Sequence, residues 1–294
     1  MSKIAVFGLN GALGGPTLEA LTSAPFAGKV AFPIKAITRT PQESTDKVQY
    51  IKGDLTSDEG VSALIEQLKD VDVIIELLNG NPTLDSAMEK IVGTVKPKLF
   101  IPSQFGTDLK ATEKVFPGFL SSKGIHSANA RKSGVKTVDV ITSLFFTKGS
   151  FLDTLVQHAG IDPEEKTVTY YGPENTQFSF SNTDDIGKAI AAIATFENKD
   201  VLPDVLHIHS GKITYKDVVK RWEAINGVTL KSKSYTWEET QKLAKDTWAT
   251  GFDPSKFLLY LNLLIGIGEG LKFDQVDNEL INPSESLFKW SAFN

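Results

Sequence analysis

Residues 4–16 read IAVFGLNGALGGP, and this stretch decides the fold class. The apolar run Ile4–Phe7 is typical of a buried parallel strand. Gly8, Gly11 and Gly14 follow the strand directly, and a segment with leucines at helical spacing comes next. This order predicts a site for the pyrophosphate of a dinucleotide, because glycines let the backbone approach the phosphates and a helix N-terminus offers free N–H groups. The contacts that we expect in this loop are Gly8, Asn10, Gly11, Ala12, Leu13 and Gly14.

The chain continues with the same alternation of apolar strands and amphipathic helices. Near-continuous apolar strands joined by helices predict an α/β fold of the Rossmann type, a doubly wound parallel sheet with helices on both faces. Sheets of this kind bind ligands at the carboxyl ends of their strands. The strands are expected at 34–38, 50–55, 71–78, 98–101 and 138–142, the last continuing to residue 146, and the helices at 57–69, 83–95 and from about 119.

The residue after the second strand predicts which dinucleotide is bound. Arg39 stands there, and no carboxylate appears until Glu43. Arginine can bind the 2′-phosphate of NADP, whereas a carboxylate would repel that phosphate. We therefore predict NADP(H) as the cofactor, with Lys47 as a second candidate ligand if its loop folds back. The alternative for both residues is a solvated loop cation.

Further contacts to the cofactor are expected where the later strands end. The carboxyl ends of neighbouring parallel strands meet at one edge of the sheet, so residues that follow different strands come together there. The candidates are Asp54 and Leu55 at the end of the third strand, Asn79 and Gly80 after the fourth, and Ser103, Gln104 and Phe105 after the fifth.

Lys123 is the candidate catalytic residue. Short-chain dehydrogenases carry a Tyr-x-x-x-Lys pair in this part of the chain, but the residue four before Lys123 is Phe119, whose ring cannot transfer a proton. A lysine buried beside a nicotinamide has a lowered pKa and can act as acid or base. Anchoring of the ribose and a surface position are the alternatives. His126 comes one helical turn later and either relays protons or is structural.

Several segments resemble one family. GLNGALG, ITR, GDL and FIPSQFG, together with Lys123, resemble the isoflavone reductase-like and NmrA-like group of atypical short-chain dehydrogenase/reductases. Gln104 stands where FIPSEFG of that family has glutamate, and the resemblance covers most of residues 1–210. In the reductase branch it implies that Lys123 transfers a proton or polarises a carbonyl. In the regulatory branch it implies a dinucleotide bound without turnover, with a protein partner.

The second half of the chain is expected to bind the substrate. We predict a cofactor domain at 1–150, to which 176–210 return, and a substrate-binding subdomain at 151–175 and 211–294. The latter should be mainly helical, with helices at 214–226, 236–247 and 254–267. Apolar residues are the candidates for the substrate pocket, and ordinary core packing is the alternative for each. They are Phe105, Leu144, Phe145, Phe146 and Phe178.

Composition excludes several other classes of function. The 294 residues include no cysteine, so disulfides, thiolate metal sites and cysteine nucleophiles are absent. His207 and His209 lack a third ligand, so we predict no metal. The net charge of −5 gives no basic footprint for nucleic acid. The most apolar run, 257–267, is too short to span a membrane, and the start lacks a secretory signal. We expect a cytoplasmic protein and leave its oligomeric state open.

Two functional hypotheses follow. The leading one is an NADPH-dependent reductase that transfers hydride to a small, largely apolar substrate (aromatic, enone, carbonyl or quinone), with Lys123 assisting proton transfer. The alternative is a dinucleotide-binding redox sensor that regulates a protein partner. Turnover of a substrate would distinguish the two.

Overall fold

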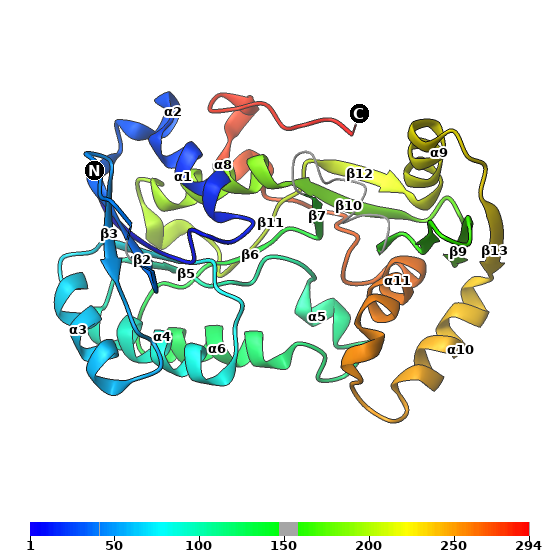
Figure 1. The fold of residues 1–294 in the computed structure, drawn as a ribbon, viewed down its shortest axis with the longest axis horizontal. Coiled ribbons are helices and arrows are strands. Elements are labelled where there is room, and N and C mark those ends of the chain that lie inside the picture. The colour runs from blue at the N-terminus through cyan, green and yellow to red at the C-terminus, as the bar shows by residue number, and fades with distance from the viewer. Residues whose placement is uncertain (41, 147–157, 294) are drawn as a thin grey trace.

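The computed structural model describes residues 1–40, 42–146 and 158–293, with only the main chain at Phe146. Its first part is built around a five-stranded parallel sheet of order β3-β2-β1-β4-β5. The helices α1 and α8 cover one face of this sheet, and α3, α4 and α6 cover the other (Figure 1). The strands are β1 (Ser2–Phe7), β2 (Val30–Thr38), β3 (Val48–Lys52), β4 (Val73–Glu76) and β5 (Leu99–Ile101). The helices are α1 (Gly14–Thr22), α2 (Ala24–Ala27), α3 (Asp58–Leu68), α4 (Pro82–Val95), α6 (Ser121–Lys132) and α8 (Thr183–Ala194).

Burial of both faces explains why these strands read as continuous apolar runs. In β1, Ile4 and Val6 belong to the core under α8, while Ala5 and Phe7 belong to the core under α3 and α4. Successive side chains of a strand point to opposite faces, so a two-faced sheet needs an apolar residue at every position. A parallel sheet with helices on both faces confirms the predicted doubly wound α/β fold.

The sixth strand differs from its prediction. β6 (Asp139–Ile141) pairs in parallel with β11 (Val205–His207), and an isolated bridge from Phe100 to Thr137 connects this pair to β5. The expected continuation to residue 146 is wrong, because Ser143 adopts a left-handed φ of 58° that breaks the strand. The next strand, β7 (Leu144–Phe146), pairs with β10 (Gln177–Asn182), which also pairs with β12 (Gly211–Thr214).

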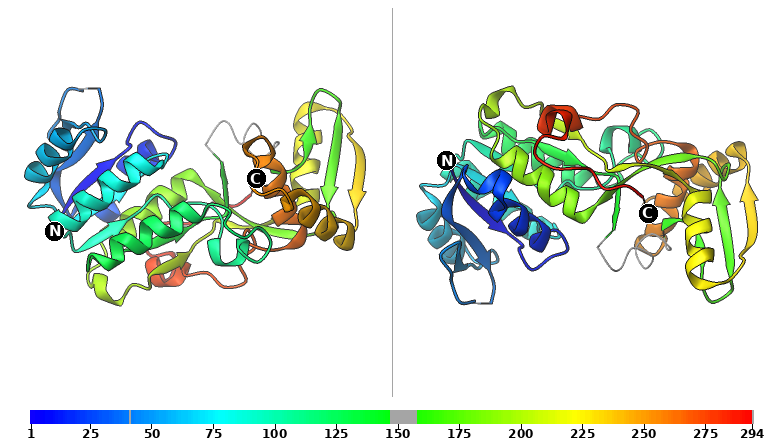
Figure 2. Two further views of the ribbon diagram at one scale, coloured as in Figure 1. Left: turned by 90° about the horizontal axis from the view of Figure 1, so that it is seen from below. Right: turned by 90° about the horizontal axis from the view of Figure 1, so that it is seen from above.

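The end of the molecule opposite the N-terminus forms a second packed unit, the distal lobe (Figures 1 and 2). Its sheet has the order β13-β9-β8 and its own apolar core. The distal lobe comprises β8 (Ile161–Asp162), β9 (Thr167–Tyr171), α9 (Tyr215–Asn226), β13 (Lys231–Tyr235), α10 (Trp237–Trp248) and α11 (Phe257–Ile267). The three predicted helices of this region are confirmed, whereas β13 was not predicted. Its KSKSY sequence is largely exposed and carries no apolar run.

Short elements complete the chain. α5 (Leu109–Thr112) lies between β5 and α6, and α12 (Asn278–Ile281) lies near the C-terminus. Among the described residues, 3₁₀ turns span Lys199–Val201, Pro254–Lys256 and Pro283–Glu285. Within the described residues, no helix is long and apolar enough to cross a membrane. The division of the chain into domains at 150, 175 and 210 stays a prediction.

Candidate functional site

The glycine loop between β1 and α1 is tightly packed, and two of its glycines are required by the backbone. Gly8 has a φ of +89°, and a Cβ there would lie 2.6 Å from the carbonyl oxygen of Leu77. A Cβ at Gly14 would lie 2.0 Å from the carbonyl oxygen of Leu9. At Gly11 the nearest atom would be 3.3 Å away, and this residue is exposed. Gly8 and Gly14 therefore shape the loop, while Gly11 leaves open the surface that a ligand would approach.

The N-terminus of α1 lies at the end of this loop, and the Gly14 N–H donates to the carbonyl oxygen of Gly11 at 3.0 Å. Leu13 is the N-cap residue and makes no side-chain hydrogen bond to the helix. The first N–H groups of a helix have no partner within the helix, and they attract anions. Asn10, Gly11 and Ala12 in front of them are exposed. The predicted pyrophosphate contacts are thus together at one accessible helix end.

Arg39 lies beside the same loop. It follows β2 at the carboxyl edge of the sheet, and its side chain is exposed and makes no ion pair within the described part of the chain. The segment after Arg39 reaches the glycine loop, because Gln42 Nε2 donates to Asn10 Oδ1 at 3.2 Å. Arg39 is therefore available to an anion bound near Asn10.

Lys47 does not join this group. Its carbonyl oxygen accepts from the Ile34 N–H, and Val48 pairs with Ile34 at the start of the β2–β3 ladder. Because both strands are parallel, Lys47 lies at the amino edge of the sheet, opposite Arg39. This register contradicts the expectation that the loop carrying Lys47 folds back to the 2′-phosphate.

The residues after β3 and β4 have local roles of their own. The Asp54 carboxylate accepts from the Thr56 hydroxyl at 2.6 Å, from the Thr56 N–H at 2.8 Å and from the Ser57 hydroxyl at 2.8 Å, and these bonds lower its pKa. Leu55 packs against the core of the sheet. Asn79 and Gly80 are exposed just before α4. Asp54 thus holds the turn into α3, while Asn79 and Gly80 stay open at the carboxyl edge.

The residues after β5 fasten α6 to the sheet. Gln104, 2% exposed, donates through Nε2 to the carbonyl oxygen of Lys123 at 2.5 Å and to Ser127 Oγ at 2.7 Å. Its Oε1 is buried without a hydrogen-bond partner in the described structure. Phe105 packs into the core of the first sheet, so its ring is a core residue and not an open contact. Gln104 is therefore a positioning residue for Lys123.

Lys123 lies at the carboxyl edge near the start of α6. Its ammonium group donates to the carbonyl oxygen of Ser103 at 2.8 Å. Burial lowers the pKa of Lys123, and the negative charges of Glu76 and Asp85 oppose this shift. A partly buried amine with a lowered pKa can give up a proton more readily than an exposed lysine.

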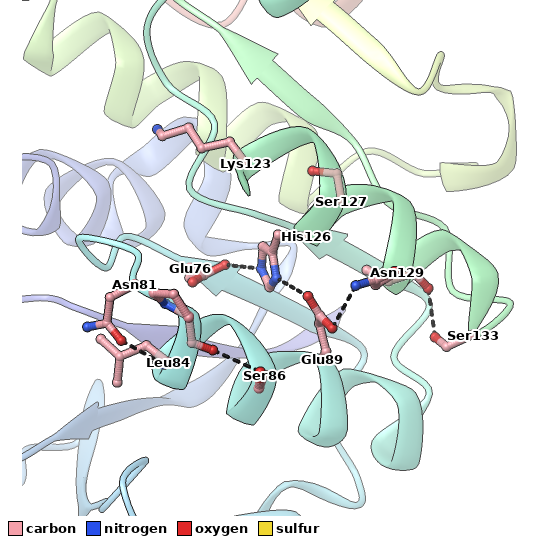
Figure 3. A network of polar contacts seen from close by, with 12 residues as sticks. Glu76, Asn81, Leu84, Ser86, Glu89, Lys123, His126, Ser127, Asn129 and Ser133 are labelled. Atoms are coloured by element: carbon pink, nitrogen blue, oxygen red, sulfur yellow. Dashed lines mark hydrogen bonds and ion pairs between the residues drawn. The ribbon is translucent and has the colours of Figure 1, made fainter. Parts of the chain in front are cut away.

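His126 has different neighbours from those expected. Its Nε2 lies 3.0 Å from Glu76 Oε2, and its Nδ1 lies 3.0 Å from Glu89 Oε1. Burial alone would lower the pKa of His126, but hydrogen bonds to both carboxylates raise it to about 9. Figure 3 shows the Lys123 ammonium directed away from this imidazole, so the structure does not pair the two. Glu76 was missed, and its only signal was a carboxylate inside the apolar run VIIELL at 73–78.

The predicted substrate residues lie mostly in cores. Leu144 is buried in the distal core, and Phe178 is fully buried with its ring 6.0 Å from that of Tyr215. The assignment of Phe178 to an open pocket is therefore corrected, because its ring presents no surface to a ligand. Phe145 is partly buried, and the side chain of Phe146 lies outside the described residues.

Phe119 belongs to an aromatic cluster just before α6. The members of this cluster are Phe116, Phe119, Trp248, Phe252, Phe257 and Tyr260. Phe252 is 52% exposed, so the cluster reaches the protein surface at this residue. The two histidines of the LHIHS segment have separate partners. His207 Nε2 lies 2.8 Å from Asp108 Oδ2, and His209 Nδ1 lies 3.0 Å from Ser179 Oγ.

A polar hollow of about 680 Å³ lies at the opposite, amino edge of the sheet. It is lined by Met1, Lys29, Asp72, Lys98 and Lys199 among others. None of the predicted site residues lines it, so this hollow is separate from the candidate site.

Comparisons with known proteins agree with this fold. A family model described as the NmrA-like family matches residues 1–250. Isoflavone reductase homolog P3 of Arabidopsis thaliana is 28% identical over 266 residues, which cover 84% of this chain and 82% of that protein. The crystal structure of isoflavone reductase matches with a TM-score of 0.68 at 21% identity, over 95% of this chain and 94% of the other. The binary complex of leucoanthocyanidin reductase and NADPH from Vitis vinifera matches with a TM-score of 0.70 at 16% identity, over 97% and 95%.

Proposed function

Because this chain belongs to the NmrA-like family, we propose that it is an NADP(H)-dependent reductase acting on a small, largely apolar substrate. The observation that carries the proposal is a juxtaposition at one edge of the sheet. The exposed Gly11, the uncapped start of α1 and the Lys123 ammonium all lie where the parallel strands end. The relatives named as reductases, and the NADPH complex among the matching structures, support the same activity.

The residues present fit a dinucleotide of the NADP type. The N–H groups of α1 and the backbone around Gly11 would hold the pyrophosphate. Arg39, exposed and without an ion pair in the described structure, would bind the 2′-phosphate. Asn79, Gly80 and Ser103 would line the path toward Lys123. When bound, NADPH supplies the hydride.

The chain itself supplies the proton and holds the proton donor in position. Lys123 holds a proton at Nζ, and burial makes that proton easier to give to the reduced substrate. Gln104 and the carbonyl oxygen of Ser103 keep the lysine at the edge of the sheet. The Phe119 ring takes no part in proton transfer, since it is enclosed in the aromatic cluster.

The aromatic cluster supports a substrate with an aromatic or conjugated, largely apolar body. Residues 151–175 and 211–294 would form the substrate-binding subdomain, and 1–150 with 176–210 would bind the cofactor. The substrate classes to test are aromatic enones, aldehydes and related carbonyl compounds, and quinones.

The test is an NADPH-oxidation screen over these classes, followed by absorbance of NADPH. We expect turnover with at least one class, and turnover that is lower by about 100-fold to 10,000-fold when Lys123 is replaced by alanine. Absence of turnover with every class, combined with tight and redox-selective dinucleotide binding, would overturn the reductase in favour of a regulatory sensor with a protein partner.

A further inference from the structure

Three metal-ligating side chains converge beneath the candidate site from three elements. Glu76 ends β4, Asp85 stands in the first turn of α4, and His126 lies on α6. One ligand atom from each lies within 4.8 Å of the other two. Glu76 and His126 are nearly inaccessible to solvent, at 1% and 5%. These residues are 9 to 50 positions apart in the sequence, so the fold alone brings them together.

Glu89 orients the imidazole from the other side. Its Oε1 lies 3.0 Å from His126 Nδ1, and its Oε2 accepts from Asn129 Nδ2 at 3.0 Å. Figure 3 shows the imidazole between the carboxylates of Glu76 and Glu89. Nε2 therefore faces Glu76. A histidine metal ligand commonly has a carboxylate on the ring nitrogen that does not bind the metal. Glu89 takes that place on Nδ1, and Nε2, which lies 3.0 Å from Glu76 Oε2, is the nitrogen that would bind an ion.

The charges of the cluster favour a cation. Glu76, Asp85 and Glu89 contribute three carboxylates, and one imidazole lies among them. The Asp85 carboxylate makes no hydrogen bond and no ion pair with any described residue, and it is partly buried. The ammonium of Lys123 is bound to Ser103 and directed away. The three carboxylates outnumber the one imidazole, and buried charge that is only partly paired is costly, so a divalent cation would stabilise this arrangement.

We propose that Glu76, Asp85 and His126 bind a divalent transition-metal ion, with Glu89 holding His126 in place. Two ligands on metal bonds of about 2.0–2.1 Å lie roughly 3 Å apart, which matches the distance of 3.0 Å between His126 Nε2 and Glu76 Oε2. One imidazole nitrogen with carboxylate oxygens suits zinc or cobalt, whereas magnesium and calcium prefer oxygen ligands alone. The ion would tie β4, α4 and α6 together, independently of any hydride transfer.

The experiment uses the full-length protein after treatment with a chelator. Zinc chloride is titrated by calorimetry, and cobalt chloride by visible absorption, which reports the ligand field of the bound ion. We expect one equivalent to bind and to raise the thermal midpoint. Asp85→Asn should abolish most of the binding and still fold, because Asp85 has no side-chain partner to lose. Glu89→Gln should weaken binding about 10-fold to 100-fold, the usual effect of losing an orienting carboxylate.

Asp58→Asn is the matched control. Asp58 is an exposed aspartate that pairs with Lys90 on α4, outside the cluster, so its loss should leave metal binding unchanged. Failure of zinc and cobalt to bind, or binding that Asp85→Asn leaves intact, would overturn the site. A cluster that is only an ion-paired network gives neither a cobalt spectrum nor a thermal shift with metal. These outcomes do not depend on whether the protein reduces a substrate.

Discussion

Two buried clusters meet at the segment that carries Lys123, and they differ in what holds them together. On the sheet side, Glu76, His126 and Glu89 are joined by hydrogen bonds of 3.0 Å between charged groups. On the side of the distal lobe, the aromatic cluster packs Phe119 with its ring centre 5.6 Å from that of Tyr260. Phe119 and His126 are only seven residues apart, so one short segment joins both environments.

This difference indicates which property of the protein each cluster controls. Charged pairs are directional, and removing one partner leaves a buried charge uncompensated. Aromatic packing is less directional, and its loss is felt mainly as a cavity. We therefore expect changes on the sheet side to alter chemistry and cofactor choice, and changes on the aromatic side to alter stability.

Replacing Lys123 gives the largest expected effect. Lys123→Ala should lower turnover about 100-fold to 10,000-fold, because it removes the proton donor at the meeting point of the two clusters. The affinity for NADPH should change little. Lys132→Ala, at the exposed end of the same helix, is the control. Steady-state kinetics and fluorescence titration with NADPH measure both quantities, and unchanged turnover would remove Lys123 from the chemistry.

Phe116 tests the aromatic side. Its ring is fully buried, with ring centres of Trp248 and Tyr260 both 5.1 Å away. Phe116→Ala should lower the free energy of unfolding by about 3–5 kcal/mol, measured by urea denaturation. Phe252→Ala, in the same cluster but 52% exposed, should cost clearly less. Equal losses for the two variants would contradict the interpretation that burial decides the cost.

Arg39 tests cofactor choice on the sheet side. Arg39→Ala should reduce the preference for NADPH over NADH about 10-fold to 100-fold, because a hydrogen bond to a charged group contributes about 1.5–3 kcal/mol. Binding of each dinucleotide is compared by calorimetry. Lys47→Ala, at the amino edge, serves as the control and should leave the preference intact. If the intact protein bound both dinucleotides equally, the assignment to NADP(H) would fail.

The smallest expected effect concerns pH. Burial and the charge of Lys212 lower the pKa of His209 to about 4, whereas the carboxylates raise that of His126 to about 9. His209 is neutral when folded but takes up a proton near 6.5 when unfolded. Its contribution to stability is therefore complete above pH 6.5 and declines as the pH falls toward 4.

Thermal unfolding at pH 7.5 and pH 5 measures this effect. The loss of stability on acidification should be a few degrees smaller in His209→Gln than in the unchanged protein. Identical pH dependence of both proteins would show that His209 does not titrate as its buried position requires.

Local patterns account for most of the correct predictions. The apolar run before the glycines predicted β1, and the helical pattern in 214–267 predicted α9, α10 and α11 to within a few residues. The motif resemblance was confirmed by the family match over residues 1–250. Such signals come from residues that are neighbours in the sequence, so they can be interpreted without knowledge of tertiary contacts.

The errors arose where contacts between segments far apart in the sequence decide the local structure. The left-handed turn at Ser143 has no glycine or proline to announce it, yet its hydroxyl bonds to the carbonyl oxygens of Ser179 and Leu271 inside the molecule. Lys47 was assigned to the phosphate from its charge alone, whereas the register of β2 and β3 places it at the other edge. Phe178 is aromatic and near the expected pocket in sequence, but its packing puts it in a core.

By itself, the sequence determined the order of the first five strands with the helices between them, the glycine loop and the absence of thiol chemistry, because these depend on residue type and short spacing. Only the tertiary structure decided that His126 lies between Glu76 and Glu89 and that Lys123 is directed away from it. Those contacts join residues 37 and 50 positions apart, and no local rule of spacing describes them. The charge around the candidate site is therefore a property of the fold, because a carboxylate and an imidazole act on each other only once packing has brought them within hydrogen-bond distance.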